Sequence, residues 1–359
     1  MKKKILISCL HRPDRSPSQR FRFEQYLEIL SQNGFEYTYS YLINEKDDNI
    51  FYAKGHYLAK LYILIKSCFK RIIELKKLDS YDIIYVQREA FMLGTTFFER
   101  QYAKSSAFFI LDFDDSIWLQ NVSNNNKSLS FLKNAKKTDE LIHIADKVVA
   151  GNSYLADYAL KLNKNCIVIP TTVDTDKFSP TELSPKSKVC IGWSGSPSTI
   201  EHFKTILPLL HKIQDQFGDS IYFKVIGAPD FSDPLLQLTS IPWSSETEVS
   251  EMQEFDIGIM PLPNNEWTKG KCGLKGLTYM SLEITTVMSA VGVNNEIIQN
   301  GINGFLCEDD EEWLDTLTIL IQNKSKRESV QKKGRTTVID KFSIHSQKEN
   351  YIRLMNTNN

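Results

Sequence analysis

The sequence lacks two features that would place the protein outside a reducing, aqueous compartment. Its six cysteines are scattered, with no CxxC pair and no histidine cluster nearby, which argues against a disulfide framework or a zinc site. No stretch approaches the ~18 apolar residues that a membrane span needs. The opening MKKKILISCL has a short apolar run that His11 and Arg12 interrupt, so we expect a first β-strand there and no signal peptide. A cytoplasmic protein is the resulting expectation.

Net charge is close to zero, but the two halves of the chain differ in sign. Residues 1–170 hold 25 Lys and Arg against 19 Asp and Glu, and the remaining residues hold 18 against 25. The N-terminal half therefore carries +6 and the rest −7. This asymmetry predicts an anionic partner for the N-terminal half, either a lipid surface or a phosphorylated acceptor, and speaks against general binding of nucleic acid.

Length and pattern predict two α/β domains. A chain of 359 residues exceeds the usual size of one domain. Strand-like runs such as KILISC, DIIYVQ, KVCIGWSG and DIGIMPL alternate with helical patterns, which is typical of parallel sheets built from βαβ units. The Pro-, Ser- and Thr-rich segment Pro170–Lys188 resembles a linker. We expect Rossmann-like domains at 1–172 and 186–339, with a last helix at about 340–359.

Five segments, in order and at their spacing, resemble one enzyme family over nearly the whole chain. They are ADKVVAGNSYLADYA, IPTTVDTDKFSP, IGWSGSPST, FDIGIMPLPNNEWTKGKCGLKGLTYM and VGVNNEIIQNGINGFL. The family is the GT-B glycosyltransferases, specifically the retaining family 4, or glycosyl transferases group 1. The resemblance implies two Rossmann-like domains facing across a cleft, with the last helix crossing back to the first domain. It implies a nucleoside-diphosphate sugar in the C-terminal domain, an acceptor in the N-terminal domain, and no cofactor or metal.

The segment Trp267–Met280 joins a predicted buried strand to a helix. At such junctions the unpaired N–H groups and the helix dipole attract anions. Lys271 and Lys275 are four residues apart and would share a helix face, whereas Lys269 would point elsewhere. Gly273 would let the backbone approach a phosphate. We expect Lys271 and Lys275 to bind and stabilise the departing diphosphate; the alternative is a solvated basic turn.

The same segment departs from the family pattern. Many relatives have two glutamates here, the second of which is usually taken to hold the ribose of the donor. The aligned positions in this chain are Gly270 and Thr278, and neither is acidic. Ribose recognition and catalytic competence are thereby in question, and Glu266 or Glu296 is a candidate for the missing carboxylate.

Other predicted donor-binding residues follow strands of the second domain. The turn WSGSPST lacks the Arg and Lys that relatives place there, but its backbone amides and hydroxyls could hold phosphate. A small-residue turn with no ligand is the alternative, and for Glu296 the alternative is a helix cap. The predicted donor-binding residues outside the lysine pair are Trp193, Gly195, Ser196, Gly227, Glu266, Gly273, Asn294, Asn295 and Glu296.

A basic segment, HRPDRSPSQRFRFEQYL, follows the first predicted strand. Ser18, Arg20 and Arg22 would lie at a helix start, where arginines oppose the helix dipole. An anion nearby would explain them, so we expect contact with phosphate or acceptor. Surface arginines beside Glu24 are the alternative.

Three carboxylates end another predicted strand, in FILDFDDSIWLQ. Asp112, Asp114 and Asp115 would repel each other unless a positive group lies close. A metal site and a phosphatase-like nucleophile with Ser116 are alternatives to the role we favour, which is binding an acceptor hydroxyl or orienting the two arginines. Asp114 is the candidate catalytic carboxylate. If the reaction inverts configuration, Asp114, Asp115 or His11 is the candidate base.

The segment Lys54–Lys77 alternates apolar and basic residues in a helical pattern. Such a helix is able to lie on anionic lipid. A helix whose apolar face meets the core and whose lysines meet water gives nearly the same pattern. The inner face of the plasma membrane is thus a candidate partner.

The combined prediction is a metal-independent, hexosyl-type glycosyltransferase. It would move a sugar from a nucleoside-diphosphate donor to a glycan or lipid-linked hydroxyl, with retention, in surface polysaccharide or lipopolysaccharide synthesis. A non-catalytic binding protein and a sugar-nucleotide epimerase of the same fold are the alternatives.

Overall fold

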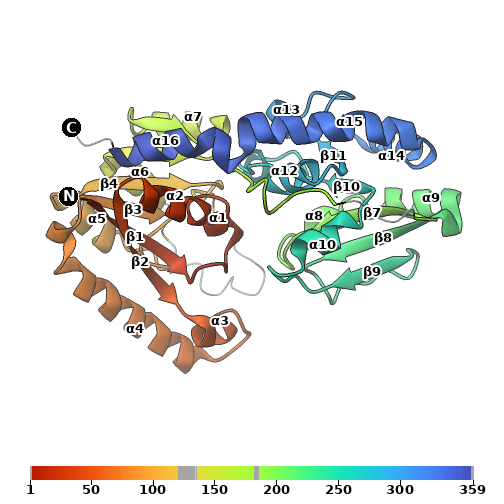
Figure 1. Ribbon diagram of the computed structural model, residues 1–359. Helices are drawn as coiled ribbons and strands as arrows, with labels where there is room; N and C mark the ends of the chain where they lie inside the picture. The colour runs from red at the N-terminus through yellow and green to blue at the C-terminus, as the bar shows by residue number, and fades with distance from the viewer. Residues whose placement is uncertain (1, 120–133, 135, 182–185, 357–359) are drawn as a thin grey trace. The chain divides into compact units, whose positions relative to one another are not determined.

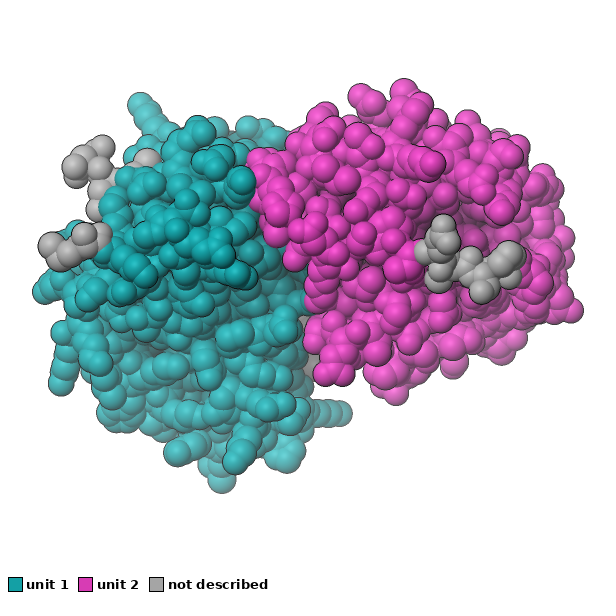
Figure 2. Space-filling view, viewed as in Figure 1, with its two compact units in different colours: residues 1–170, 348–359 teal, residues 171–347 magenta. Residues whose placement is uncertain are grey.

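The computed structural model of the protein describes residues 2–119, 134, 136–181 and 186–356. The chain divides into two compact units, which are residues 1–170 with 348–359, and residues 171–347 (Figure 2). Residues 182–185 of the predicted linker and the last three residues of the predicted final helix lie outside the described residues.

The described part of unit 1 contains a six-stranded sheet in the order β2-β1-β3-β4-β5-β6, all of it parallel (Figure 1). Its strands are β1 (Lys3–His11), β2 (Phe35–Ile43), β3 (Ile83–Gln87), β4 (Phe108–Phe113), β5 (Lys147–Ala150) and β6 (Cys166–Val168). Every residue of β3 is buried, as expected for a strand of a parallel sheet with both faces covered.

The helices of unit 1 include short pieces where a longer helix is predicted. They are α1 (Pro17–Arg20), η1 (Glu24–Tyr26), α2 (Leu27–Gln32), α3 (Glu45–Phe51), α4 (Tyr57–Leu75), η2 (Leu78–Ser80), α5 (Phe97–Lys104), α6 (Lys137–Ile144), α7 (Ser153–Leu160) and the end of α16 (Ile344–Asn356). The expectation that both Arg20 and Arg22 occupy a first helical turn holds for Arg20 and is wrong for Arg22. The four-residue α1 ends at Arg20, and Arg22 lies beyond it.

Unit 2 repeats the architecture. Its described residues form a parallel six-stranded sheet in the order β12-β11-β10-β7-β8-β9. The strands are β7 (Val189–Ser194), β8 (Ile221–Ile226), β9 (Leu238–Ile241), β10 (Ile257–Met260), β11 (Thr285–Ser289) and β12 (Phe305–Cys307). The helices are α8 (Ile200–Lys204), α9 (Leu207–Phe217), η4 (Gly218–Ser220), α10 (Glu248–Gln253), α11 (Glu266–Lys269), α12 (Leu274–Ser281), α13 (Asn294–Ile297), α14 (Asp310–Gln322), α15 (Lys324–Thr337) and η5 (Val338–Phe342). The predicted α/β class, with two Rossmann-like halves, is confirmed.

In both sheets successive strands are added first on one side of the unit's first strand and then on its other side, so the strand order changes direction beside that first strand. In unit 1 this point lies between β1 and β3, and in unit 2 between β7 and β10. Ligands of open parallel sheets bind outside the carboxyl ends of the strands at such switch points. The loops after β1 and β3, and those after β7 and β10, are therefore where a site is expected.

Two glycines in register bring α12 close to the centre of the second sheet. Gly192 of β7 pairs with Gly258 of β10. A Cβ atom on Gly258 would lie 2.6 Å from the ring of Tyr279, which belongs to α12. The Tyr279 hydroxyl accepts a hydrogen bond of 2.8 Å from the backbone N–H of Ser194, at the end of β7. This contact fixes where α12 lies against the switch point.

A buried ion pair ties the loop after α1 to β4 in unit 1. Arg22 donates to both carboxylate oxygens of Asp112, at 3.1 and 2.5 Å, and neither side chain is exposed. Arg22 also donates to the carbonyl oxygen of Ile169 at 2.5 Å. The cation that the aspartate cluster requires is therefore Arg22, ninety residues earlier in the chain.

We expect Asp112→Ala to lower the free energy of unfolding by about 3–5 kcal/mol, because it leaves Arg22 as a buried charge without its counterion. The double variant Arg22→Met/Asp112→Leu should recover most of this loss, since it removes both charges and keeps the volume. Urea unfolding followed by circular dichroism measures both, with the exposed Asp79→Ala as control. A loss for Asp112→Ala no larger than that of the control would contradict the assignment.

Candidate functional site

The two lysines of the predicted phosphate site lie over aromatic rings next to the switch point of unit 2. Lys275 is in the first turn of α12, and its Nζ is 5.4 Å from the ring centroid of Trp193 in β7. Lys271 precedes the helix, and its Nζ is 4.9 Å from the ring centroid of Trp267. Cation–π contacts of this kind attract an ammonium group to the face of an aromatic ring. The two ammonium groups therefore lie over indole rings in the part of unit 2 where β7 and β10 end.

Lys269 points elsewhere, as predicted. Its Nζ is 2.7 Å from a carboxylate oxygen of Glu266 on the exposed side of α11. Glu266, a candidate for the missing acid, is therefore occupied by a neighbouring lysine.

The Trp193 ring packs in the core of unit 2 below the ammonium group of Lys275. Its side chain is only 1% exposed and belongs to the hydrophobic core of unit 2, where it packs against Phe203. This corrects the expectation of direct donor contact through the indole. A Cβ atom on Gly195 would lie 2.4 Å from the Trp193 ring, so the turn after β7 needs glycine at this position. Ser196 follows as an exposed residue, with its Oγ 2.8 Å from that of Ser198.

The turns after β7 and β8 meet through backbone atoms. Gly227 has φ +93°, and a Cβ atom there would lie 2.0 Å from the carbonyl oxygen of Gly195. Any larger residue at position 227 would push the two turns apart. The close approach of these two turns therefore requires glycine at position 227.

The predicted residues after β11 lie beside the start of α12. Gly273 has φ +70°, and a Cβ atom there would lie 2.3 Å from Ile297 and 3.6 Å from Oδ1 of Asn294. Asn294 is buried and donates from Nδ2 to the carbonyl oxygen of Ser289, while its Oδ1 has no hydrogen-bond partner among the described residues. Asn295 and Glu296 are exposed. The structure therefore brings Asn294–Glu296 to the lysine junction.

The two positions that are acidic in many relatives have structural roles in this chain. Gly270 ends α11, and Thr278 is buried and donates from Oγ1 to the carbonyl oxygen of Lys275 at 2.8 Å. A carboxylate at position 278 would lose that bond. The threonine instead stabilises the turn of α12 that carries Lys275.

In unit 1 the polar residues at the switch point form arginine–carboxylate pairs. Arg88, which follows β3 in the left-handed conformation (φ +64°), donates to Oδ1 of Asp114 at 3.0 and 2.8 Å. It also donates to Oγ of Ser18 at 2.7 Å and lies 3.6 Å from Asp115. Sequence analysis missed Arg88, although its place directly after a buried strand was a usable signal.

The other arginines of the basic segment also have acidic neighbours. Arg20 lies 3.2 Å from Asp14, and both Arg12 and Arg15 contact Asp48. Of the predicted phosphate or acceptor residues, Ser18, Asp114 and Asp115 are brought together by Arg88. Arg22 and Asp112 are instead a buried pair with no exposed surface, which agrees with the expected orientation of an arginine by these carboxylates and corrects the expectation that the pair contacts a ligand.

The titratable groups of this cluster have shifted pKa values. Burial lowers the pKa of His11 to about 4, and the charge of Arg15 adds to this effect. Burial alone would raise the pKa of Asp114, but the charge of Arg88 and the Ser18 hydroxyl outweigh it and lower the pKa. His11 is therefore neutral and Asp114 ionised at pH 7.

Unit 2 resembles a known family in sequence, and the whole chain resembles solved structures in fold. Residues 191–323 match the family model described as Glycosyl transferases group 1. No curated protein sequence matches the chain.

Solved structures match over the whole chain. A glycosyltransferase from Rickettsia africae ESF-5 aligns with a TM-score of 0.69 and 16% identity, covering 99% of this chain and 98% of that one. Sucrose-phosphate synthase from Thermosynechococcus elongatus has a TM-score of 0.73 at 12% identity, with 99% and 98% covered. HepE from Anabaena, in complex with UDP and glucose, has a TM-score of 0.66 at 13% identity, with both chains fully covered.

The fold is therefore that of the GT-B glycosyltransferases. Residues 191–323 match the glycosyl transferases group 1 model, and the predicted resemblance is confirmed. Within the described ranges, no helix combines the length and apolarity required to cross a bilayer.

The low pKa of His11 predicts acid sensitivity of unit 1. Between pH 6.5, the ordinary value, and about 4, the unfolded chain binds a proton that the folded chain does not, so stability falls as pH falls. The slope is at most about 1.4 kcal/mol per pH unit in this window. Urea unfolding from pH 7 to 4.5 should show a shallower decline for His11→Gln than for the parent chain. Parallel declines would show that His11 titrates normally.

Proposed function

We propose that the protein is a glycosyltransferase that moves a sugar from a nucleoside-diphosphate donor to a hydroxyl group of a glycan or lipid-linked acceptor. Unit 2 would bind the donor and unit 1 the acceptor. The observation that carries the proposal is the placement of Lys271 and Lys275 beside the switch point of unit 2, inside the matched group 1 domain.

The chemistry of the donor explains why lysines are needed there. Breaking the bond between the anomeric carbon and the diphosphate oxygen leaves extra negative charge on the phosphate. Fixed cations that meet this charge as it develops lower the barrier, because they stabilise the transition state more than the bound donor. HepE, one of the similar structures, was solved with UDP-glucose, which makes uridine nucleotides the first donors to try.

We further propose that the sugar is transferred with retention. In that mechanism the leaving diphosphate takes the proton of the acceptor hydroxyl on the same face, and no protein base is required. A general base works best with a pKa near the working pH. The pKa of His11 is about 4, and that of Asp114 lies below its ordinary value, so both are weak bases. This supports retention over inversion.

The acceptor proposal rests on unit 1. Arg88, Asp114 and Ser18 offer hydroxyl-binding groups at the carboxyl edge of its sheet, and residues 1–170 carry a charge of +6. The carboxylates of the DFDD segment are held by arginines, which favours a metal-independent enzyme over a metal-binding aspartate cluster. We also propose that the donor carries a hexose. The enzyme would act in the cytoplasm, in the synthesis of surface polysaccharide or lipopolysaccharide.

Two other functions suit the same fold. A non-catalytic binding protein would explain the missing acids at Gly270 and Thr278, and it would show neither transfer nor donor hydrolysis. A sugar-nucleotide epimerase would form product without any acceptor. The anomeric configuration of a transfer product, read by NMR, separates retention from inversion.

Loss of either site lysine should weaken donor binding. A ligand at about 100 times its dissociation constant stabilises a protein by ~2.7 kcal/mol, so a thermal-shift screen of UDP-, GDP-, ADP- and CMP-sugars will identify the donor. We expect Lys271→Ala and Lys275→Ala to reduce the shift by that donor. Lys269→Ala, which removes a lysine paired with Glu266, is the matched control and should keep it.

If both site variants retain the full shift, the phosphate assignment fails. If no nucleotide sugar shifts the parent protein, the proposed function itself loses its support.

Glu296 is the stronger candidate for the missing carboxylate, because α13, which carries it, packs beside Gly273 at the start of α12. We expect Glu296→Gln to weaken binding of the identified donor roughly tenfold to a hundredfold, the loss of one hydrogen bond to a charged group. Glu266→Gln should leave affinity within about twofold. Removing the ribose 2′-hydroxyl from the donor should weaken binding to the parent but not to Glu296→Gln. Equal losses in both proteins would place Glu296 away from the ribose.

A further inference from the structure

Helix α4 turns its apolar face away from the protein. At 3.6 residues per turn, positions 58, 62, 65, 69 and 73 fall on one side of the helix. Leu58 is 85% exposed and Phe69 62% exposed. The exposed apolar residues of this face include Leu58, Leu61, Tyr62, Ile65, Phe69 and Ile73. We call these six residues the α4 stripe.

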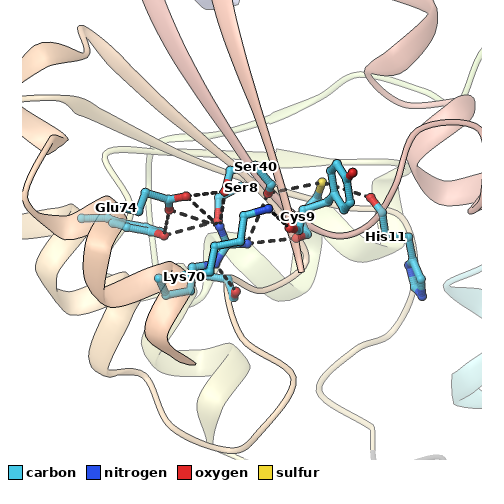
Figure 3. A network of polar contacts seen from close by, with 10 residues as sticks. Ser8, Cys9, His11, Ser40, Lys70 and Glu74 are labelled. Carbon is cyan, nitrogen blue, oxygen red and sulfur yellow. Dashed lines mark hydrogen bonds and ion pairs between the residues drawn. The ribbon is translucent and has the colours of Figure 1, made fainter. Parts of the chain in front are cut away.

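The opposite face of α4 is buried and largely polar at its centre, with Ile63, Ser67 and Arg71 turned inward. Arg71 is fully buried and donates to Oγ of Ser40 at 2.8 Å and to the carbonyl oxygen of Cys9 at 2.9 Å. Glu74 contacts both Arg71 and Ser40, and Lys70 donates to the carbonyl oxygen of Tyr41. Figure 3 shows Lys70 and Glu74 reaching toward Ser40 on β2 and Ser8 and Cys9 on β1. These bonds fix the rotation of α4 about its axis.

This orientation is the reverse of that of an ordinary surface helix, whose apolar stripe faces the core. It overturns the alternative in which the apolar face of Lys54–Lys77 meets the core and its lysines meet water. Figure 1 shows α4 at the periphery of unit 1, beyond β2 and next to α3. Contiguous apolar patches of this kind mark surfaces that bind protein or membrane.

We propose that the α4 stripe inserts into the interfacial region of an anionic membrane, with the helix axis parallel to the surface. This goes beyond the proposed glycosyl transfer and does not depend on it. Of the seven Lys and Arg in residues 54–77, Arg71 is buried against Glu74 and Lys66 is paired with Asp47, so the lysines at the two ends of the helix carry the charge of the stripe's rim. Lys54 precedes the helix, Lys76 and Lys77 follow it, and all three are exposed.

The pattern of charge selects lipid over a second copy of this chain. A symmetric dimer through the stripe would bring the same cationic rim of each subunit against the other, which repels. Anionic headgroups would instead meet these lysines while the stripe reaches the acyl boundary. A helix of 19 residues is ~28 Å long, so the stripe offers an extended line of contact.

The test measures binding of the full chain to phosphatidylcholine vesicles with and without phosphatidylglycerol, by co-sedimentation. We expect binding to the anionic vesicles and at least tenfold weaker binding to neutral ones. The variant Leu58→Ser/Tyr62→Ser/Phe69→Ser should lose binding to both. Leu160→Ser/Leu235→Ser/Ile319→Ser, which removes exposed apolar residues from other elements, is the matched control and should bind like the parent.

Two further measurements test the contribution of the lysine charges and the depth at which the α4 stripe inserts. Lys76→Gln/Lys77→Gln should weaken binding to anionic vesicles by about fivefold per lysine. Tryptophan placed at Phe69 should be quenched by brominated lipid more strongly than tryptophan placed at Leu235, against the same background of native tryptophans.

Three results would overturn the proposal: equal binding of the stripe and control variants, equal quenching at the two tryptophan positions, or concentration-dependent dimerisation that the stripe variant abolishes in the absence of vesicle binding. Because every variant is made at exposed positions, circular dichroism should show the parent spectrum throughout. Vesicle binding with no nucleotide-sugar binding would retain this inference and refute only the glycosyltransferase proposal.

Discussion

The hydrogen bond from the Ser194 amide to the Tyr279 hydroxyl is the contact on which the arrangement of unit 2 depends. It joins the end of β7 to the middle of α12, and it is possible only because Gly258 leaves room for the tyrosine ring. Lys275 lies four residues before Tyr279 on the same helix, so the bond that anchors the tyrosine also sets the position of the lysine. The position of the charged edge of unit 2 is therefore fixed by the packing of its core.

The charged residues at the switch point of unit 1 are held by ion pairs, in contrast to those of unit 2. Its arginines are balanced by carboxylates: Arg22 by Asp112 in the interior, and Arg88 by Asp114 nearer the surface. A ligand that approaches this edge meets preformed hydrogen-bonding groups with little net charge, which suits hydroxyls better than diphosphate. The lysines of unit 2 lie over indole rings instead, and the role proposed for them is to bind the diphosphate of the donor.

Sequence alone predicted the α/β class, the two halves and the basic junction of unit 2, because these follow from local periodicity and from the residue types at strand ends. It also suggested that the aspartates after β4 orient the arginines of the basic segment, and Arg22 does pair with Asp112, ninety residues away. It did not specify which carboxylate meets which arginine, and it did not include Arg88, because a distant pairing is decided by the topology of the sheet. The periodicity of Lys54–Lys77 identified an apolar face, but only the bonds of Arg71 and Glu74 determine that this face points outward.

The close contact of Gly195 with Gly227 bears on how donor choice could be altered. A Cβ atom on Gly227 would meet the Gly195 carbonyl oxygen, and one on Gly195 would meet the Trp193 ring, so neither position accommodates a side chain. Asn295 and Glu296 after β11 are exposed and free of that constraint. Libraries made to redirect an enzyme built on this plan therefore have more room at Asn295 and Glu296 than at the two glycines.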